Sequence, residues 1–154
     1  MEHNDFHTFS EYMKKENHSL TASMEDYLEM IYRLSKNTGF TRIHELSKAL
    51  NVQPPSATKM VQRLAILNYL KYEKYGVILL KEDGKQMGEV LLKRHTIIEE
   101  FLRILDISEV VILMETEKIE HTISAETVER FKEYTRFIQD HPEIHKKFIT
   151  YQKA

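Results

Sequence analysis

The chain has 154 residues, 42% of them hydrophobic and 30% charged, and its formal net charge is −2 with His neutral. This composition is typical of a globular protein that is long enough to bury a core. The absence of Cys excludes disulfides, thiolate catalysis, cysteine-based zinc sites and iron–sulfur clusters. Because no apolar run approaches the roughly 20 residues of a membrane span and no secretory signal opens the chain, we expect a cytoplasmic protein with no membrane partner.

Charge is distributed unevenly along the chain. Residues 41–95 carry 10 basic and 5 acidic side chains, whereas residues 1–40 carry 4 basic and 7 acidic ones and residues 96–154 carry 8 basic and 12 acidic ones. A basic segment between acidic ones is typical of a module that faces a polyanion, attached to a body with another task. Ordinary scatter of surface charge is the alternative explanation.

The first 20 residues are set apart as an N-terminal extension. They are expected to form a tail or a small amphipathic helix, and their histidines, His3, His7 and His18, offer a less favoured further metal site. From Ser23, apolar residues recur at helical spacing until Thr38-Gly39 ends the helix, and Ser23 with Asp26 has the pattern of a capping box.

Two further helices are predicted in the basic segment. Thr41 is a suitable N-cap for a short helix, and Asn51-Val52-Gln53 forms a tight connection after it. The next helix starts at Pro54, since proline is tolerated in a first turn, and it places apolar residues on one face and polar ones on the other.

After Asn68 the hydrophobic period changes from 3.6 to 2. Two short strand-like runs, residues 69–75 and 77–80, flank Gly76, which predicts a β-hairpin. Short helices followed by a hairpin predict a winged helix-turn-helix over residues 21–88, whose second helix would enter the major groove of DNA. A winged helix that serves protein–protein contacts is the alternative. The residues expected to contact DNA are Pro55, Ser56, Thr58, Lys59, Gln62 and Arg63 of the helix and Lys71, Tyr72, Lys74 and Tyr75 of the hairpin.

Three clusters of hard ligands suggest a metal site. Asp26 and Glu29 share one helix face, His95 and Glu99 share another, and Glu117, Glu120 and His121 follow an apolar run. Each cluster alone could be an ordinary charged helix face. Together, carboxylates and imidazoles without any thiolate suit Mn²⁺ or Fe²⁺, although Zn²⁺ binds many such sites.

Several blocks of sequence resemble the diphtheria toxin repressor family of metal-dependent transcriptional repressors. They are Ser23-Met24-Glu25-Asp26-Tyr27-Leu28-Glu29, Thr58-Lys59-Met60-Val61-Gln62, Tyr72-Glu73-Lys74-Tyr75, Arg94-His95 and Glu117-x-Ile119-Glu120-His121. The resemblance spans about residues 23–152, and it is closest to the manganese-responsive members. It implies a two-ion site whose ligand positions are occupied by Asp26, Glu29, His95, Glu117, Glu120 and His121.

The resemblance also implies a homodimer that binds double-stranded operator DNA. The expected fold is mainly α, with the winged helix-turn-helix followed by an all-helical metal-binding and dimerisation domain over residues 89–154. Its dimer-facing apolar positions would come from 96–105, 110–114 and 131–138, although packing within one chain would explain some of them equally well. A short last helix over residues 142–151 would leave His141 and His145 solvated.

Iron-responsive members of the family carry Met and Cys where this chain has Asp26 and Glu117, so hard oxygen ligands here favour Mn²⁺. We therefore expect a manganese-dependent repressor of metal-uptake genes that performs no catalysis and takes no small organic substrate. Two Mn²⁺ ions per subunit are expected, with Fe²⁺, Zn²⁺ or Cd²⁺ as substitutes. The alternatives are a regulator of the same fold that responds to Fe²⁺, to Zn²⁺ or to no metal, and a carboxylate-bridged dimetal enzyme.

Overall fold

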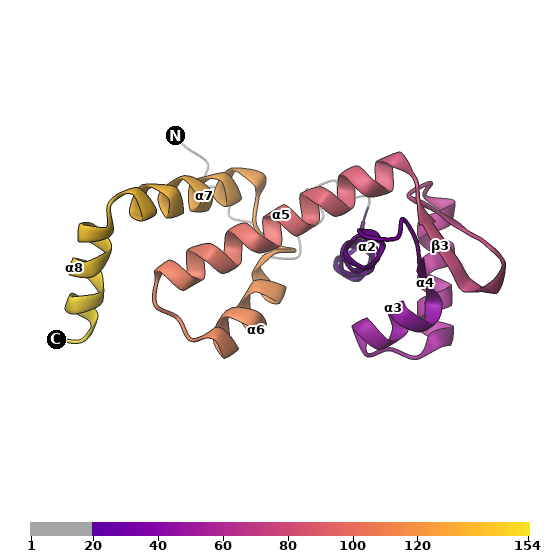
Figure 1. Cartoon of the computed structure of the whole chain (residues 1–154), viewed down its shortest axis with the longest axis horizontal. Coiled ribbons are helices and arrows are strands. Elements are labelled where there is room, and N and C mark those ends of the chain that lie inside the picture. The colour runs from indigo at the N-terminus through magenta and orange to yellow at the C-terminus, as the bar shows by residue number, and fades with distance from the viewer. Residues whose placement is uncertain (1–19) are drawn as a thin grey trace, which may run out of the picture.

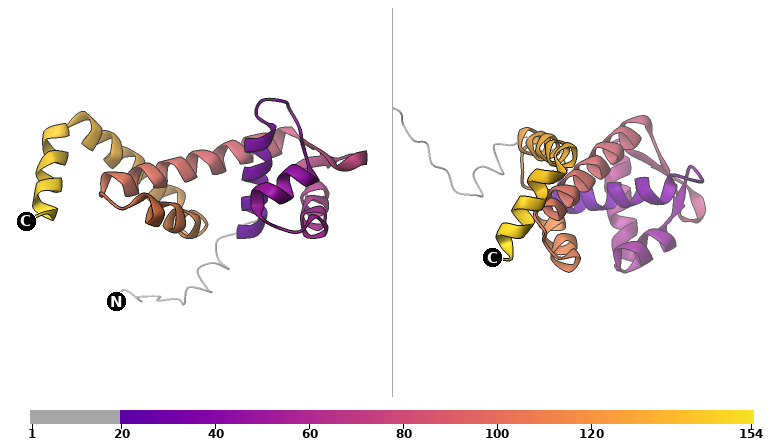
Figure 2. Two further views of the ribbon diagram at one scale, coloured as in Figure 1. Left: turned by 60° about the horizontal axis from the view of Figure 1, so that its bottom comes forward. Right: turned by 60° about the vertical axis from the view of Figure 1, so that its left-hand side comes forward.

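The computed structural model describes residues 20–154, so the predictions for residues 1–19, including a site built from His3, His7 and His18, lie outside the described residues. Two lobes lie at the ends of an elongated molecule, and one long helix leads from the first to the second (Figures 1 and 2). The elements, in chain order, are α2 (Ala22–Ser35), β1 (Thr41–Arg42), α3 (Ile43–Leu50), α4 (Pro54–Ile66), β2 (Leu70–Tyr72), a 3-10 turn (Lys74–Gly76), β3 (Val77–Leu80), α5 (Glu82–Ile104), α6 (Glu109–Ile119), α7 (Ala125–Asp140) and α8 (Pro142–Gln152).

The first lobe contains α2, α3, α4 and a small antiparallel sheet with strand order β1-β3-β2. Helix α4 begins with the two prolines at its first turn and buries Ala57, Val61 and Leu64, as the apolar spacing predicted. These side chains pack with Leu28 and Ile31 of α2 in one core. The winged helix-turn-helix predicted from the sequence is therefore present in the structure.

Two predicted helix caps are wrong. Helix α2 starts one residue before Ser23, and the Thr21 side chain accepts a hydrogen bond from the Met24 N–H, so Ser23 and Asp26 form no capping box. Thr41 lies in β1 opposite Ile78 and its hydroxyl donates to the Glu45 carboxylate, so the N-cap of α3 is Arg42. A strand of two residues is too short to leave a period in the sequence, which is why β1 was missed.

The wing hairpin turns through the 3-10 segment that links β2 to β3. Tyr75 and Gly76 both have positive φ, 63° and 71°. That conformation is common for Gly and uncommon for Tyr. The Arg42 guanidinium of β1 donates a hydrogen bond to the Tyr75 carbonyl oxygen (3.2 Å), so the first strand of the sheet supports the tip of the wing.

Helix α5 connects two separate cores without interruption. Leu91 belongs to the core of the first lobe, whereas Ile98 and Leu102 pack with Ile112 of α6 in the second. The predicted division of domains after residue 88 falls inside this helix and stays a prediction. Along α5, Leu91 still packs in the first core and Ile98 already packs in the second. His95 lies between these two residues, at the seam between the two lobes.

The second lobe is helical throughout, in agreement with the predicted fold class. Phe131 of α7 stacks on Phe101 of α5 with ring centroids 3.9 Å apart, so this predicted dimer-facing position packs within the chain. Exposed apolar side chains remain on α6 at Val110 and Leu113, which are 76% and 60% exposed. These two remain candidates for the predicted contact between subunits.

His141 and His145, which were expected to be solvated, each also form a contact within the chain. Both side chains are half-buried, and each places a ring nitrogen on a backbone carbonyl oxygen. His141 contacts the oxygen of Phe137 at 2.7 Å, and His145 contacts that of Ile104 at 3.2 Å. The second contact attaches α8 to the end of α5, a pairing across 41 residues that local spacing does not reveal.

Candidate metal centre

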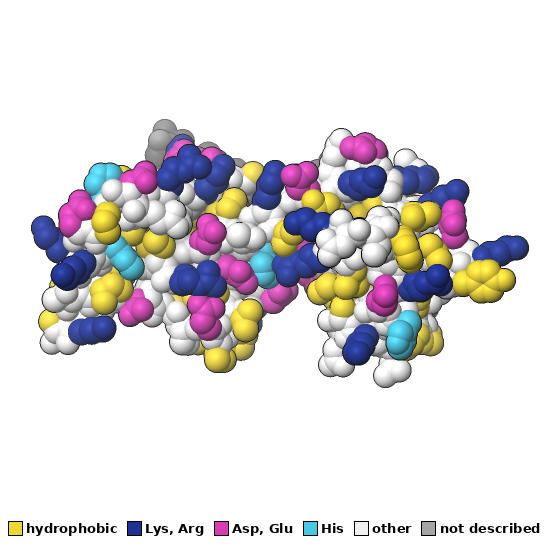
Figure 3. All heavy atoms as spheres, in the orientation of Figure 1, with side chains coloured by type: hydrophobic (Ala, Val, Ile, Leu, Met, Phe, Trp, Pro, Cys, Tyr) yellow, Lys and Arg dark blue, Asp and Glu magenta, His cyan; other side chains and the backbone are white. Residues whose placement is uncertain are grey.

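Carboxylates and imidazoles gather where α2, α5 and the end of α6 meet. In the space-filling view, acidic and histidine side chains lie together at the junction of the two lobes (Figure 3). The six residues predicted as metal ligands fall into two groups there, and these groups contain no other residue. In each group, one ligand atom from every member lies within 4.8 Å of the others.

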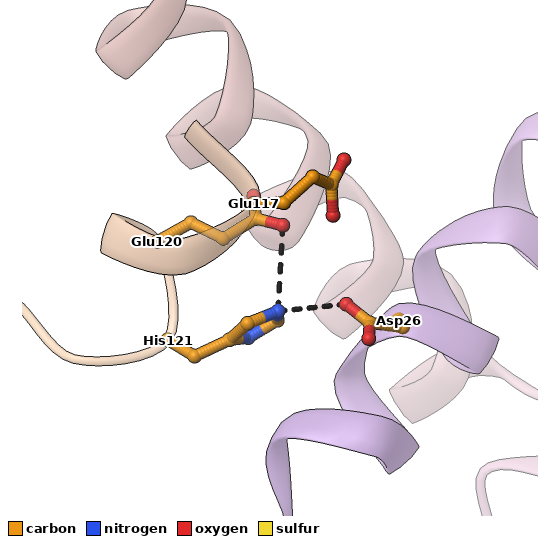
Figure 4. Close-up of side chains that lie close together, drawn as sticks. All are labelled: Asp26, Glu117, Glu120 and His121. Atoms are coloured by element: carbon orange, nitrogen blue, oxygen red, sulfur yellow. Dashed lines mark ion pairs between the residues drawn. The ribbon is translucent and has the colours of Figure 1, made fainter. Parts of the chain in front are cut away.

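The first group consists of Asp26, Glu117, Glu120 and His121 (Figure 4). His121 Nε2 lies 2.7 Å from Asp26 Oδ1 and 3.5 Å from Glu120 Oε1. Asp26 comes from the first lobe on α2, whereas Glu117 and Glu120 come from the C-terminal turn of α6 and His121 follows directly. The group therefore spans the two lobes.

The second group consists of Glu29, His95 and Glu120, all of which are buried. His95 Nδ1 lies 2.9 Å from Glu120 Oε2 and 3.8 Å from Glu29 Oε1. Glu117 Oε1 is also 3.9 Å from the same nitrogen. This second group again joins α2 to α5 and α6.

Glu120 belongs to both groups and offers one carboxylate oxygen to each. Its side chain is 1% exposed, so this charge is almost completely removed from water. Within residues 20–154, Glu120 Oε1, Asp26 Oδ1 and both ring nitrogens of His121 are buried and form no hydrogen bond. Buried polar atoms that converge without hydrogen bonds fit a cation placed among them, because coordination would satisfy Glu120 Oε1, Asp26 Oδ1 and the His121 Nε2 that faces them.

Electrostatics in the centre favour positive charge. The hydrogen bond to Glu120, opposed by burial and helped by the charges of Glu120 and Glu29, raises the pKa of His95 to about 9. Contact with Asp26, followed by Glu25, raises the pKa of His121 to about 10. Burial, followed by repulsion from Glu120, raises the pKa of Glu29. Each shift has the sign expected where several carboxylates lie close together without a counter-ion.

Sequence reasoning missed three residues that surround the ligands. Glu25 of α2 is buried and accepts a hydrogen bond from Arg94 of α5, and Glu25 Oε1 lies 3.7 Å from His121 Nδ1. Burial opposes ionisation of Glu25, but His121 and Arg94 outweigh it and lower its pKa. Arg33 donates to Glu29 one helical turn away. These cations offset part of the negative charge. The spacing of Arg33 from Glu29 was a visible signal, whereas the pairing of Glu25 with Arg94 spans 69 residues.

Glu99 was predicted to share a helix face with His95 but is not one of the six predicted ligands. It contacts His95 Nε2, the ring nitrogen that does not face Glu120. Its Oε1 lies 3.0 Å from His95 Nε2. His95 is thus held between two carboxylates, with Nδ1 directed to the shared Glu120. A carboxylate on the far nitrogen fixes the orientation of a ligating imidazole in many metal sites.

Most residues predicted to contact DNA are exposed on α4 and on the wing of the first lobe. Pro55, Ser56, Lys59, Gln62 and Arg63 are exposed on α4, and Thr58 is half-buried beside them. Lys71, Lys74 and Tyr75 are exposed on the wing, with Tyr75 the most exposed at 91%. Tyr72 is half-buried and packs against the core, so its predicted contact with DNA would use only its outer edge.

Comparison with known proteins agrees with this arrangement. The model of the iron-dependent repressor N-terminal DNA-binding domain matches residues 19–78, and that of the iron-dependent repressor metal-binding and dimerisation domain matches residues 81–149. The chain belongs to the iron-dependent repressor family. The resemblance to the diphtheria toxin repressor family is thereby confirmed, and so are the fold class and the prediction that the chain is not an enzyme, since the family consists of transcriptional repressors.

Individual relatives are similar over most of the chain. It is 40% identical to the HTH-type transcriptional regulator MntR of Lysinibacillus sphaericus, over 82% of this chain and 91% of the relative. Among solved structures, it superposes on the manganese regulator SloR with a TM-score of 0.66 and 29% identity, over 77% of this chain and 55% of that one. It superposes on ScaR with bound Zn²⁺ with a TM-score of 0.62 and 31% identity, over 74% and 54%. The chain thus spans about half the length of these two solved proteins.

No helix among residues 20–154 is long and apolar enough to cross a membrane.

Proposed function

We propose that this chain is a manganese-responsive transcriptional repressor that acts as a homodimer and holds two Mn²⁺ ions per subunit. The observation that carries the proposal is the position of Glu120, which is buried between two ligand groups and gives one oxygen to each. A carboxylate shared in this way suits a pair of neighbouring cations. Asp26, Glu117, Glu120 and His121 would hold one ion, and Glu29, His95 and Glu120 the other.

The choice of manganese is supported by the chemistry of the donors. Every predicted ligand is a carboxylate oxygen or an imidazole nitrogen, and the chain contains no Cys. Such a set suits a hard divalent ion better than a thiolate-seeking one. Relatives named for manganese regulation support the same choice, and the related structures of ScaR with bound Zn²⁺ and with bound Cd²⁺ support these two ions as substitutes.

The ligands would couple metal to DNA through the position of the two lobes. Asp26 and Glu29 lie in the lobe that carries the exposed face of α4, whereas Glu117, Glu120 and His121 lie in the other lobe and His95 lies at the seam. A bound cation supplies the positive charge that lets these carboxylates stay close together. Convergence of the ligands would then fix the orientation of α4 and, in a dimer, the separation of the two α4 helices.

In a homodimer, the α4 helices must fit half-sites about one helical turn of DNA apart. Lys59 and Arg63 are suited to phosphate or guanine, and Gln62 to a base edge. The genes under control would be those for metal uptake, which is what membership of this repressor family implies. The exposed apolar side chains of α6 are the proposed subunit contact.

The decisive experiment is binding of chelator-stripped protein to a labelled operator DNA while Mn²⁺, anaerobic Fe²⁺, Zn²⁺ and Mg²⁺ are titrated in turn. We expect tight binding to appear with Mn²⁺ and to be lost in the double variant Glu117→Ala, Glu120→Ala. Glu115→Ala is a matched control, because this glutamate lies on the same helix but forms only an exposed ion pair with Lys118.

Equally tight binding without any metal would leave a DNA-binding winged helix and contradict control by metal. A second variant tests the selectivity. If oxygen at position 117 sets the preference for Mn²⁺, Glu117→Cys should broaden the response to Fe²⁺ and Zn²⁺. An unchanged order of metals would show that Glu117 does not set it.

A further inference from the structure

A cavity of about 490 Å³ lies between α5 and the start of α7, outside the metal centre. Its floor is apolar and consists of Val90, Ile97, Ile123, Ala125 and Val128. None of the residues assigned to metal or DNA lines it. A cavity of this size accommodates one or two large side chains. Because its floor is apolar, we expect those side chains to be apolar as well.

The rim of the cavity is mainly basic. Lys93 and Arg94 of α5 and Lys132 of α7 lie around it, with Glu129 as the one acidic residue of its lining. Apolar floor and basic rim together fit a segment that carries large apolar side chains and acidic ones.

The chain enters the described structure close to this cavity. Leu20 is buried and packs in the first core, and Thr21 caps α2. One turn later, Glu25 accepts a hydrogen bond from Arg94, which also lines the cavity. Four residues of helix advance only about 6 Å along the axis, so the start of α2 lies about one turn from a residue that contacts the rim.

The 19 residues before Leu20 have the matching composition. Phe6, Phe9 and Tyr12 recur at every third position, and the segment has four acidic and two basic side chains. The 11 residues from Phe9 to Leu20 can span at most about 36 to 40 Å when extended. That reach is ample for a return from the start of α2 to a cavity whose lining includes Arg94, the hydrogen-bond partner of Glu25.

We propose that residues 1–19 dock in this cavity of their own chain and insert aromatic side chains between α5 and α7. The segment is attached to α2 in the first lobe, whereas α7 belongs to the second lobe. Docking therefore ties the two lobes together from outside the metal centre. It is independent of the proposed response to metal, although a docked segment would favour the same arrangement of lobes that the ligands require.

The test uses the absence of Cys from the chain, so any disulfide must come from introduced residues. Full-length protein with Phe9→Cys and Ala125→Cys is oxidised with oxidised glutathione, in chelator and without DNA. Ala125 is exposed and lines the cavity. The matched control pairs Phe9→Cys with Arg130→Cys, since Arg130 is exposed on the same helix but does not line the cavity.

We expect about tenfold more intrachain disulfide in the first pair than in the control, at a yield that does not change with protein concentration. Adding Phe6→Ser and Tyr12→Ser to the first pair should reduce its yield to that of the control, because apolar contact drives docking. Equal yields in the two pairs would overturn the proposal. Disulfides that form only between chains would also overturn it, since a second copy would then occupy the cavity. Because neither metal nor operator DNA is present, failure here would leave the proposed repressor function untouched.

Discussion

At the scale of single residues, the centre contains two histidines whose charge depends on whether a metal is present. Without metal, the neighbouring carboxylates raise the pKa values of His95 and His121 to about 9 and about 10, so both imidazoles are cationic at neutral pH. A ligating imidazole must be neutral. The proposed metal and two protons therefore compete for the same carboxylate-rich space.

Binding of Mn²⁺ at pH 7 is accordingly expected to release about two protons per subunit. The apparent affinity for Mn²⁺ should rise as the pH increases towards the pKa values of the two histidines. Calorimetric titration in buffers of different ionisation enthalpy measures the release, since the observed heat then changes from buffer to buffer. A heat that is the same in all buffers would show that the histidines are neutral before metal binds.

The raised pKa values also predict the pH dependence of the metal-free protein. A histidine whose pKa is higher in the folded state contributes stability that is complete below its unfolded value of about 6.5 and is lost as the pH rises through the folded value. The midpoint of urea unfolding in chelator should therefore fall between about pH 6.5 and pH 10. In a His95→Gln, His121→Gln variant this fall should be much smaller, and an unchanged fall would assign it to other groups.

On the outer face of α4, single basic residues would set the salt dependence of DNA binding. Each phosphate contact contributes about −0.9 to the slope of log affinity against log salt concentration. Lys59→Ala should therefore weaken binding to all DNA sequences and reduce the slope by about 1, if Lys59 meets a phosphate. Lys48→Ala is the control, because Lys48 lies on α3 outside the predicted contact face. Equal slopes for wild type and Lys59→Ala would show that Lys59 does not contact a phosphate.

At the scale of elements, close approach of α5 to α2 places the ligands of one helix opposite those of the other. A Cβ added at Gly88 of α5 would lie 2.5 Å from the Cβ of Tyr32 on α2, closer than two such atoms can approach. Glycine at this position therefore lets the two helices pack closely. His95 of α5 and Glu29 of α2 depend on this packing for their separation of 3.8 Å.

The variant Gly88→Ala is therefore expected to push the helices apart. Overpacking of this kind typically destabilises a protein by about 1–3 kcal/mol. We expect a lower unfolding midpoint together with weaker binding of Mn²⁺, because Asp26 and Glu29 move with α2. Lys85→Ala is a suitable control, since Lys85 is exposed on the same helix and lines neither the cavity nor the metal centre. Unchanged metal affinity in a destabilised Gly88→Ala protein would show that the centre tolerates a shift of α2.

Much of the fold could be predicted from periodicity, because long elements repeat their pattern several times. The start of α4 at Pro54 and the hairpin on either side of Gly76 are examples. Short elements and caps were less predictable: Thr41 has the side chain of an N-cap but lies in a strand of two residues. The six candidate ligands were found because their types and spacing are local features of helices. Arg94 and Glu25 were missed because their pairing exists only after α2 and α5 have packed.

At the scale of the whole molecule, two cores share one continuous helix and meet at the candidate metal centre. The seam contains charged and polar ligands instead of apolar side chains, so burial of apolar surface does little to hold the lobes together there. Without metal, the protonated histidines and the neighbouring arginines offset only part of the repulsion between the carboxylates of α2 and α6 across it. The relative position of the lobes should therefore depend on metal far more than the structure of either lobe does.

Removal of metal is expected to loosen the seam selectively. Amide hydrogens around Asp26 and Glu120 should exchange faster in chelator than in saturating Mn²⁺, since both segments contribute ligands to the centre. Amides of β3, which lies in the sheet of the first lobe, provide the internal control. Exchange that accelerates equally in β3 would indicate that metal stabilises the whole fold.

The single carboxylate of Glu120 also bears on how steeply the protein would respond to manganese. Since its two oxygens face different groups, the first of the two proposed ions to bind would fix the side chain that the second one needs. Part of the cost of ordering this side chain would then be met once for both ions, and occupancy would rise more sharply with Mn²⁺ concentration than at two independent sites. A cell with such a protein would measure manganese as a threshold, with little response below it and nearly full repression above it.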